Sequence, residues 1–404
     1  MTASRGRRGR RQHARQPRAK GSVTQSHTLG KHLTVRRATG RLDKRRGVHC
    51  DAILPTTIID FFARTAHFMH KTRLKGGSLS GTYLCQGDGI EPFVRKEVSL
   101  IHNREYGFQR WYSQLKRMQR FSVLFPGAFP DLRTYGMLRD PVHGDMAYFD
   151  MEFIPNALTV QEFLMQTEDE GRIDRMFKTL TSVMARMHST QIQSTAAPME
   201  LYIYEEIEQK IAACLGDARF AAFYALPEVV FNGQTVRGLG DSLAEFKQLS
   251  AKSYRHTTET FTHGNLTLEN ILYQPAEDRI IFIDPYEENI IDSVLAEYSQ
   301  VYQSCNSKYE LYNSATAQIA GNRVTCEIPA SPGLDYFNTI FTTFVRAHHS
   351  DDDMVSIRLL EISQFARMLP FKMAIDPDKM LFFYALGSYL FHVLREERAR
   401  TGHA

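Results

Sequence analysis

Residues 262–285 constrain the fold of this chain more than any other stretch. The segment reads Thr262-His263-Gly264-Asn265-Leu266-Thr267-Leu268-Glu269-Asn270-Ile271-Leu272 and then, after a short gap, Arg279-Ile280-Ile281-Phe282-Ile283-Asp284-Pro285. The pattern predicts a short loop that carries two amides, followed by an apolar β-hairpin that ends on a single carboxylate. A sheet holds such groups rigidly while loops keep them accessible, so we expect metal and phosphate ligands to meet at these strand ends.

A glycine-rich segment earlier in the chain is a second candidate for phosphate binding. Residues 74–98 have the pattern of a strand, a glycine-rich turn, a strand, a tight turn and a strand. Gly77, Ser78 and Gly81 lie in the first turn, and Lys96 lies on the third strand. Backbone N–H groups of such a turn can approach phosphate oxygens, and Lys96 could reach the same phosphates. The alternative is a turn with no role beyond structure.

A helix and a crossing segment follow these strands. Residues 103–121 have apolar residues at steps of three and four, which predicts a helix packed on the strands. Glu105 in its first turn could pair with Lys96, or could only favour the helix N-terminus electrostatically. Further strands are predicted near 134–138 and 147–153. The segment with Glu152 and Ile154 is predicted to leave this group of strands, and its exposed backbone could meet an adenine edge.

The charge of the chain is unevenly distributed. Residues 1–50 hold 15 lysines and arginines against one acid, Asp43, which leaves 34 basic and 44 acidic residues in the remainder, a net charge of −10. The first fifty residues have almost no apolar periodicity, so we expect a disordered basic tail. This tail could bind nucleic acid or an anionic membrane surface, act as an organelle transit segment, or be a solvated extension.

Bulk features exclude several classes of protein. No run approaches the roughly eighteen apolar residues that a membrane span needs, and the basic start lacks the apolar core of a secretory signal, so we expect a soluble, cytoplasmic protein. The five cysteines lie far apart without a Cys-x-x-Cys pair, which favours buried free thiols over a zinc knuckle or a disulfide framework. Oligomeric state leaves no signal in the sequence.

The order of these features resembles the aminoglycoside phosphotransferase and choline kinase group of protein-kinase-like folds. Within that group the chain looks most like sugar-directed members associated with bacterial surface polysaccharides. The resemblance covers about residues 74–297, and its most specific part is the His263-Gly264-Asn265-Leu266 motif with Asn270 and Asp284. It implies an α+β, two-lobed fold, with an antiparallel five-stranded nucleotide-binding lobe over 51–153 and a mainly helical lobe over 154–404.

The resemblance also implies roles for individual residues. Asp284 would bind the magnesium ions that bridge the phosphates of ATP, and Asn270 would supply a further oxygen ligand, as magnesium prefers. Lys96 would hold the α- and β-phosphates with Glu105 orienting it, while the glycine-rich turn covers them. His263 would fix the loop by hydrogen bonds. The implied activity is ATP-dependent phosphorylation of a hydroxyl on a small molecule, such as a sugar or an amino alcohol.

Asn265 departs from the family pattern, which has aspartate at this position. That aspartate orients the acceptor hydroxyl and takes its proton, and loss of a general base typically costs about 10² to 10⁴ in rate. Asn265 could still orient a hydroxyl in a slow or substrate-assisted kinase, or a carboxylate such as Glu269 or Asp241 could substitute. Alternatively, the chain is a nucleotide-binding pseudokinase with a regulatory or scaffold role. Retention of the other ligands favours catalysis.

Two further acidic stretches have alternative interpretations. Tyr286-Glu287-Glu288-Asn289 could meet a cationic or polyhydroxylated acceptor, or be solvated surface. Residues 351–353 follow His348-His349 and are three aspartates, which superficially resemble a metal cluster but are predicted to cap a helix.

Overall fold

The computed structural model describes residues 70–74, 81–100, 106–140, 144–194, 198–255, 258–286 and 289–400. The predicted tail (1–50) and the candidate site residues Gly77, Ser78 and Glu105 lie outside the described residues. Glu287 and Glu288 of the acidic stretch do so as well.

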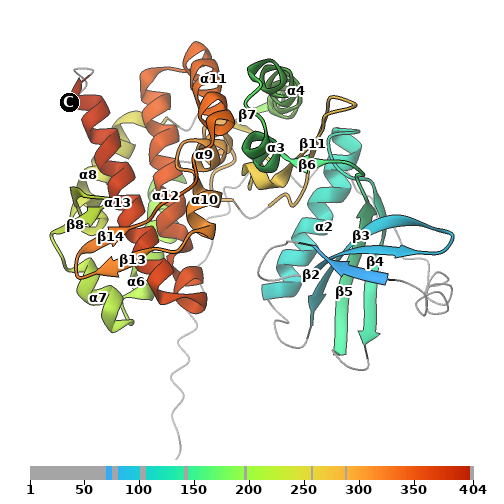
Figure 1. The fold of residues 1–404 in the computed structure, drawn as a ribbon, viewed down its shortest axis with the longest axis horizontal. Coiled ribbons are helices and arrows are strands. Elements are labelled where there is room, and N and C mark those ends of the chain that lie inside the picture. Colours follow the sequence, from blue (N-terminus) through green and yellow to red (C-terminus); the bar gives the residue numbers. More distant parts are fainter. Residues whose placement is uncertain are drawn as a thin grey trace, which may run out of the picture. The chain divides into compact units, whose positions relative to one another are not determined.

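The N-terminal lobe is built on the five-stranded antiparallel sheet that the sequence predicts (Figure 1). Its strands occur in the order β1-β2-β3-β5-β4, and every neighbouring pair is antiparallel. The bounds are β1 His70–Arg73, β2 Gly81–Gly87, β3 Ile90–Ser99, β4 Leu132–Asp140 and β5 Gly144–Glu152, with helix α2 at Tyr106–Leu124 between β3 and β4.

Alternation along β3 sorts its side chains between the two faces of this sheet. Val94 and Val98 pack into the same core as Trp111 and Met118 of α2, so Lys96, which lies between the two valines in the alternation, shares their face. The opposite face carries a buried ion pair, in which Arg95 Nε donates to Asp150 Oδ1 at 2.6 Å and Arg95 Nη2 to Asp150 Oδ2 at 2.8 Å. The sheet therefore directs Lys96 toward α2 and the large lobe.

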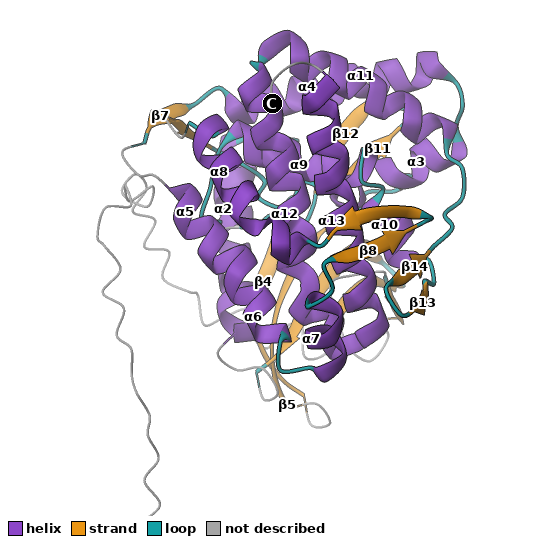
Figure 2. Cartoon of the chain, turned by 90° about the vertical axis from the view of Figure 1, so that its left-hand side faces the viewer, coloured by secondary structure: helices purple, strands orange, loops and turns teal. Residues whose placement is uncertain are grey.

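The C-terminal lobe is mainly helical (Figure 2). Its first half consists of β6 Leu158–Thr159, α3 Val160–Gln166, α4 Glu170–His188, β7 Gln191–Gln193, α5 Pro198–Ile203, the π-helix η2 Tyr204–Glu208, α6 Gln209–Cys214, α7 Ala218–Tyr224, β8 Glu228–Phe231, β9 Gln234–Arg237 and α8 Leu239–Ser253. Its second half consists of β10 Thr258–Thr260, the 3₁₀ turn η3 Leu268–Asn270, β11 Ile271–Gln274, β12 Arg279–Phe282, α9 Val294–Cys305, α10 Tyr309–Ser314, β13 Gln318–Ala320, β14 Arg323–Thr325, α11 Pro332–His348, α12 Asp351–Ile375 and α13 Pro377–Arg400. The described strands of this lobe form small sheets in the orders β10-β7, β12-β11-β6 and β13-β14-β8-β9.

The predicted apolar β-hairpin forms as strands β11 and β12. Leu158 and Thr159 pair with β11 as strand β6, so helix α3 begins at Val160. The long helix α4 ends at His188, and the π-helix η2 separates α5 from α6. Ser350 caps α12 together with Asp353, which confirms that the three aspartates belong to a helix start.

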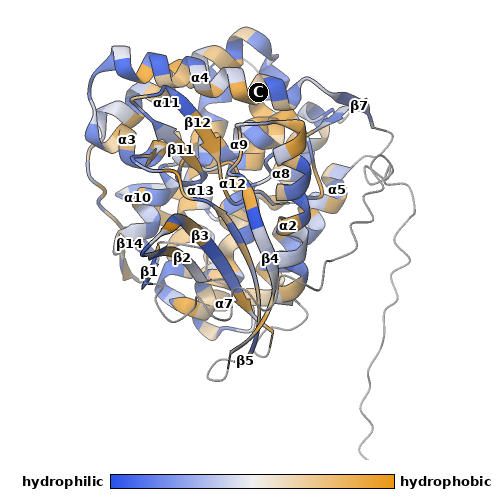
Figure 3. Cartoon of the chain, turned by 90° about the vertical axis from the view of Figure 1, so that its right-hand side faces the viewer, coloured by the Kyte–Doolittle hydropathy of each residue, from blue (hydrophilic) through white to orange (hydrophobic). Residues whose placement is uncertain are grey.

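Two hydrophobic cores hold the chain together. The first extends from the small-lobe sheet and α2 to α4, α9 and α11, and the second surrounds α13. Helix α12 serves both, because Ile357 and Leu360 belong to the first core while Leu359 and Ile362 belong to the second. Peripheral helices such as α4 instead alternate hydrophobic and hydrophilic residues along their length (Figure 3). Among the described helices, none is both long and apolar enough to cross a membrane.

Candidate active site

The structure brings Lys96 of β3 and Asp284 after β12 into direct contact. Lys96 Nζ donates to Asp284 Oδ1 at 2.6 Å, and Gln114 Nε2 on α2 lies 3.4 Å from the same oxygen. Burial alone would raise the pKa of Asp284, but the ion pair with Lys96 outweighs it, so this pKa lies below its usual value. Asp284 is therefore ionised at neutral pH, and its carboxylate is anionic.

Asp284 occupies an unusual backbone conformation. Its φ angle is 57°, in the left-handed region that non-glycine residues rarely adopt. Such conformations cost about 1–3 kcal/mol and persist where the surrounding structure enforces them, often at functional sites. The residue before it is fixed, because Ile283 N donates to Asn270 O at 3.0 Å. This hydrogen bond joins the end of the hairpin to its start.

The two predicted amides, Asn265 and Asn270, are joined within the loop. Asn270 Nδ2 donates to the backbone carbonyl of Asn265 at 2.7 Å. Since this contact uses the NH₂ group of Asn270, its Oδ1 stays available as an oxygen ligand. The side chain of Asn265 is half-buried.

His263 is a buried, neutral residue that braces the loop. Its Nε2 donates to Ile283 O at 2.7 Å, and its Nδ1 accepts from Asn265 N at 3.3 Å. Burial lowers the pKa of His263 to about 3, so the imidazole stays neutral in the physiological range. With both ring nitrogens engaged and its ring stacked on Phe129, His263 is placed to hold the loop and not to transfer protons.

One polar face of helix α9 binds backbone groups of the loop that carries His263 and Asn265. Glu297 accepts from His263 N at 2.7 Å and from Gly264 N at 3.1 Å. Gln300 accepts from Leu266 N at 2.6 Å and donates to Gly264 O at 2.9 Å, and Ser304 accepts from Leu268 N at 2.9 Å. These three side chains were not singled out by the sequence, although their spacing of three and four residues on a helix is the signal that they share a face.

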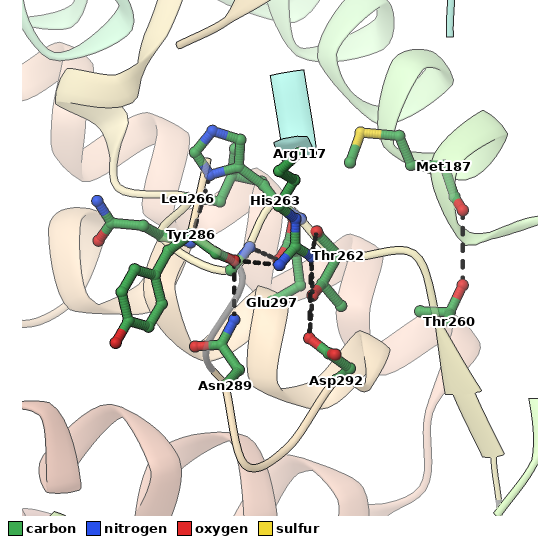
Figure 4. Close-up of polar contacts among 12 residues, drawn as sticks. Arg117, Met187, Thr260, Thr262, His263, Leu266, Tyr286, Asn289, Asp292 and Glu297 are labelled. Carbon is green, nitrogen blue, oxygen red and sulfur yellow. Dashed lines mark hydrogen bonds and ion pairs between the residues drawn. The ribbon is translucent and has the colours of Figure 1, made fainter. Parts of the chain in front are cut away.

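Glu297 is an ionisable group that is almost fully buried, with 1% of its surface exposed. Burial raises its pKa to about 7, while the two backbone N–H donors and Arg117 act in the opposite direction. The close-up in Figure 4 shows Glu297 and Arg117 beside the segment that carries Thr262 and His263.

Helix α2 contributes polar residues that the sequence analysis did not single out. Arg110, Gln114 and Arg117 are spaced by four and three residues, so they lie on one face of α2. Gln114 lies beside Asp284, the ion-pair partner of Lys96. The sequence predicts a different residue of the helix, Glu105, near Lys96. Within the described residues Lys96 is paired with Asp284, so the predicted orientation of Lys96 by Glu105 stays a prediction.

The other predicted site residues are placed as follows. Gly81 opens β2, where an added Cβ would lie 2.5 Å from the ring of Tyr83. The backbone N–H of Glu152 donates to Asp131 O at 2.8 Å, so Glu152 cannot offer this group to an adenine. Ile154, just beyond β5, is the better candidate for that contact.

Asp241, one suggested substitute base, is at the start of α8. The N–H of its neighbour Gly240 donates to the Tyr384 hydroxyl at 3.1 Å, and Tyr384 belongs to the second hydrophobic core around α13. Asp241 therefore lies beside the second core, whereas Leu266, the neighbour of Asn265, belongs to the first. The other suggestion, Glu269, lies in η3 within the motif and acts electrostatically on Tyr309.

Tyr286, two residues after Asp284, has guanidinium neighbours from both lobes. The Arg110 guanidinium of α2 lies 5.4 Å from the Tyr286 ring centre, and that of Arg367 on α12 lies 5.6 Å from it. Arg367 Nε also lies 3.1 Å from Glu206 Oε2 in the π-helix η2. Tyr286, Arg367 and Glu206 thus form a row of an aromatic, a cationic and an anionic side chain that begins two residues after Asp284.

Comparisons with known proteins identify the fold. No protein-family model matches the chain, and no curated protein matches its sequence. A thermostable mutant of aminoglycoside phosphotransferase APH(4)-Ia in its apo form matches with a TM-score of 0.53 and 11% identity over 83% of this chain and 97% of that one. A ternary complex of such a mutant with ADP and hygromycin B matches with a TM-score of 0.54 and 10% identity over 83% and 98%. The chain therefore has the two-lobed α+β fold of these kinase-like proteins, as predicted.

Proposed function

We propose that this chain is an ATP- and magnesium-dependent phosphotransferase that phosphorylates a hydroxyl of a small molecule, such as a sugar or an amino alcohol. The observation that carries the proposal is the 2.6 Å contact between Lys96 Nζ and Asp284 Oδ1. This contact supports the proposal because a cation suited to phosphates and an anion suited to a metal ion meet at one point, in a fold shared with a phosphotransferase crystallised with ADP and with AMP-PNP.

The residues at this point fit a magnesium ion. Asp284 supplies an ionised carboxylate, and Asn270 keeps its amide oxygen available because its NH₂ group binds Asn265 O. Hard oxygen donors of this kind are those that magnesium prefers. Asp284 and Asn270 would hold the ion, which would neutralise part of the charge on the phosphates. Lys96 would hold the α- and β-phosphates, and Ile154 would offer backbone groups to the adenine.

The chemistry at the acceptor follows from Asn265. The oxygen of the acceptor hydroxyl attacks the γ-phosphorus, the bond between that phosphorus and the β–γ bridging oxygen breaks, and ADP leaves with the electron pair. An amide can accept a hydrogen bond from the hydroxyl but cannot take its proton. In the substrate-assisted route, the proton passes to an oxygen of the transferred phosphoryl group. Asn265 then orients the hydroxyl, and the chain relies on positioning and charge neutralisation.

The second candidate function is a nucleotide-binding regulatory or scaffold protein that transfers nothing. Asn265 is the observation that favours it, because the residue that would take the acceptor proton is an amide. Nucleotide binding cannot separate the two functions, since both predict it.

Transfer of a labelled γ-phosphate separates them. The chain is incubated with [γ-³²P]ATP and magnesium over a panel of sugars and amino alcohols, with Asp284→Ala as the blank. The proposal expects label on at least one acceptor above the blank. If parent and blank agree on every acceptor while the parent still binds ADP, the regulatory function is correct.

A further inference from the structure

Arg117 of helix α2 is a buried cation whose hydrogen-bond partners lie in the large lobe. Its side chain is only 7% exposed, and its guanidinium lies 5.0 Å from the ring centre of Phe121. A buried guanidinium is costly unless its donors are engaged. Its partners therefore show what the chain gains by burying it.

Those partners are the two loops of the active site. Arg117 Nη1 donates to Tyr286 O, and Arg117 Nη2 donates to Thr262 O (Figure 4). Thr262 lies three residues before Asn265, and Tyr286 lies two residues after Asp284. One guanidinium thus binds the segment of the hydroxyl-orienting residue and the segment of the metal-binding residue.

The neighbouring contacts make this junction specific for an arginine. The two loops are joined directly, because Tyr286 N donates to His263 O at 2.9 Å. Asp292 Oδ1 lies 3.9 Å from Arg117 Nη2 and accepts from Thr262 Oγ1 at 2.7 Å, so the cation has a carboxylate close by. A planar guanidinium can serve two carbonyls at once, whereas an ammonium on a flexible stem has no such fixed fork.

We infer that Arg117 is a positioning residue for phosphoryl transfer, which fixes Asn265 and Asp284 relative to one another by holding the carbonyls of Thr262 and Tyr286. The inference rests on the proposed function. Helix α2 therefore packs on the sheet and, through Arg117, also sets the geometry of the two loops of the large lobe. Misplacement of reacting groups by about 1 Å can cost about 100-fold in rate.

The test compares Arg117→Met with Lys116→Met, an exposed neighbour on the same helix. Methionine keeps most of the apolar stem of Arg117 and removes every donor. Arg117→Met is expected to lower kcat for label transfer by about 100-fold with little change in the KM for ATP. Amide hydrogen exchange is expected to accelerate in residues 262–266 and 284–286 and to stay unchanged in α12. Lys116→Met should match the parent in every measurement.

A rescue experiment separates positioning from general damage. Arg117→Ala leaves space for a small guanidinium, so added methylguanidinium should restore part of kcat, and an equal concentration of methylammonium should not. Should either variant fail to fold, Arg117→Lys gives the same comparison, with an intermediate kcat expected. A parent-like kcat and parent-like exchange in Arg117→Met, or acceleration spread evenly over the chain, would overturn the inference. If the parent itself transfers no label above Asp284→Ala, the proposed function fails, and hydrogen exchange still decides whether Arg117 holds the loops.

Discussion

Lys96 and Asp284 are 188 residues apart in the chain, and their side chains form a hydrogen-bonded ion pair of 2.6 Å. On the sheet, the neighbours of Lys96 are apolar, because Val94 and Val98 share its face. Among the residues that the structure describes, the charged partner of this ammonium is Asp284, at the end of the β11–β12 hairpin. This pairing unites the two sequence motifs that were predicted separately.

Replacing Lys96 tests the nucleotide-binding half of this pair. Lys96→Met removes a charge-assisted hydrogen bond, a class worth about 1.5–3 kcal/mol, so we expect the Kd for ADP with magnesium to rise about tenfold or more. Isothermal titration calorimetry measures it. Lys71→Met is the matched control, because Lys71 pairs with Glu97 on the other face of the same sheet. Equal losses of affinity in both variants would contradict the assignment.

Restoring a carboxylate at position 265 tests the chemistry. In Asn265→Asp a general base becomes available at the acceptor hydroxyl, so the rate of label transfer is expected to rise by about 10² to 10⁴ where proton transfer limits it. Asn265→Ala removes the orienting amide and should lower the rate below that of the parent. Steady-state label transfer at saturating ATP compares the three. A parent-like rate in both variants would show that position 265 does not contact the acceptor.

Gly264 is required by the close approach of the two loops. Its φ angle is 81°, and a Cβ there would lie 2.2 Å from Tyr286 O and from Asn289 Nδ2. Gly264→Ala should therefore lower the free energy of unfolding by at least about 3 kcal/mol, from backbone strain and steric overlap together. Gly127→Ala is the control, since Gly127 has a φ of 77° but open space around its Cα, and should cost only about 1–2 kcal/mol. Urea denaturation measures both free energies of unfolding. Equal losses in Gly264→Ala and Gly127→Ala would show that a Cβ at position 264 meets no steric overlap.

Local patterns were enough to predict the residues that carry the proposed chemistry. The spacing of His263, Asn265, Asn270 and Asp284 predicted a loop and a hairpin that ends on a carboxylate, and the structure has that loop and that hairpin. That these residues bind metal and phosphate stays a prediction. Such motifs can be predicted because short-range backbone geometry fixes where each side chain points. The position of Lys96 could be predicted for the same reason, since it alternates with apolar residues on a strand.

The supporting residues could not be predicted in this way, because their partners are distant in the sequence. Glu297 binds backbone groups 33 and 34 residues away, and Arg117 binds carbonyls 145 and 169 residues away. The sequence around a buried polar residue on a helix does not indicate which distant group it will bind. The same holds for the parallel pairing of β14 with β8, where Arg323 lies opposite Val230. Only the packing of the whole chain determines these contacts.

Glu297 makes a pH dependence predictable, because burial raises its pKa from 4.5 to about 7. Between these values the folded chain binds more protons at Glu297 than the unfolded chain does, so this group's contribution to stability is fully present below pH 4.5 and is lost as the pH rises to about 7. Glu297→Gln removes this titration. The free energy of unfolding of Glu297→Gln minus that of the parent should therefore increase by about 3 kcal/mol over this interval and stay level above it. Urea denaturation of both proteins at a series of pH values measures the difference. Parallel curves would mean that Glu297 is ionised in the folded chain throughout, held by the N–H groups of His263 and Gly264.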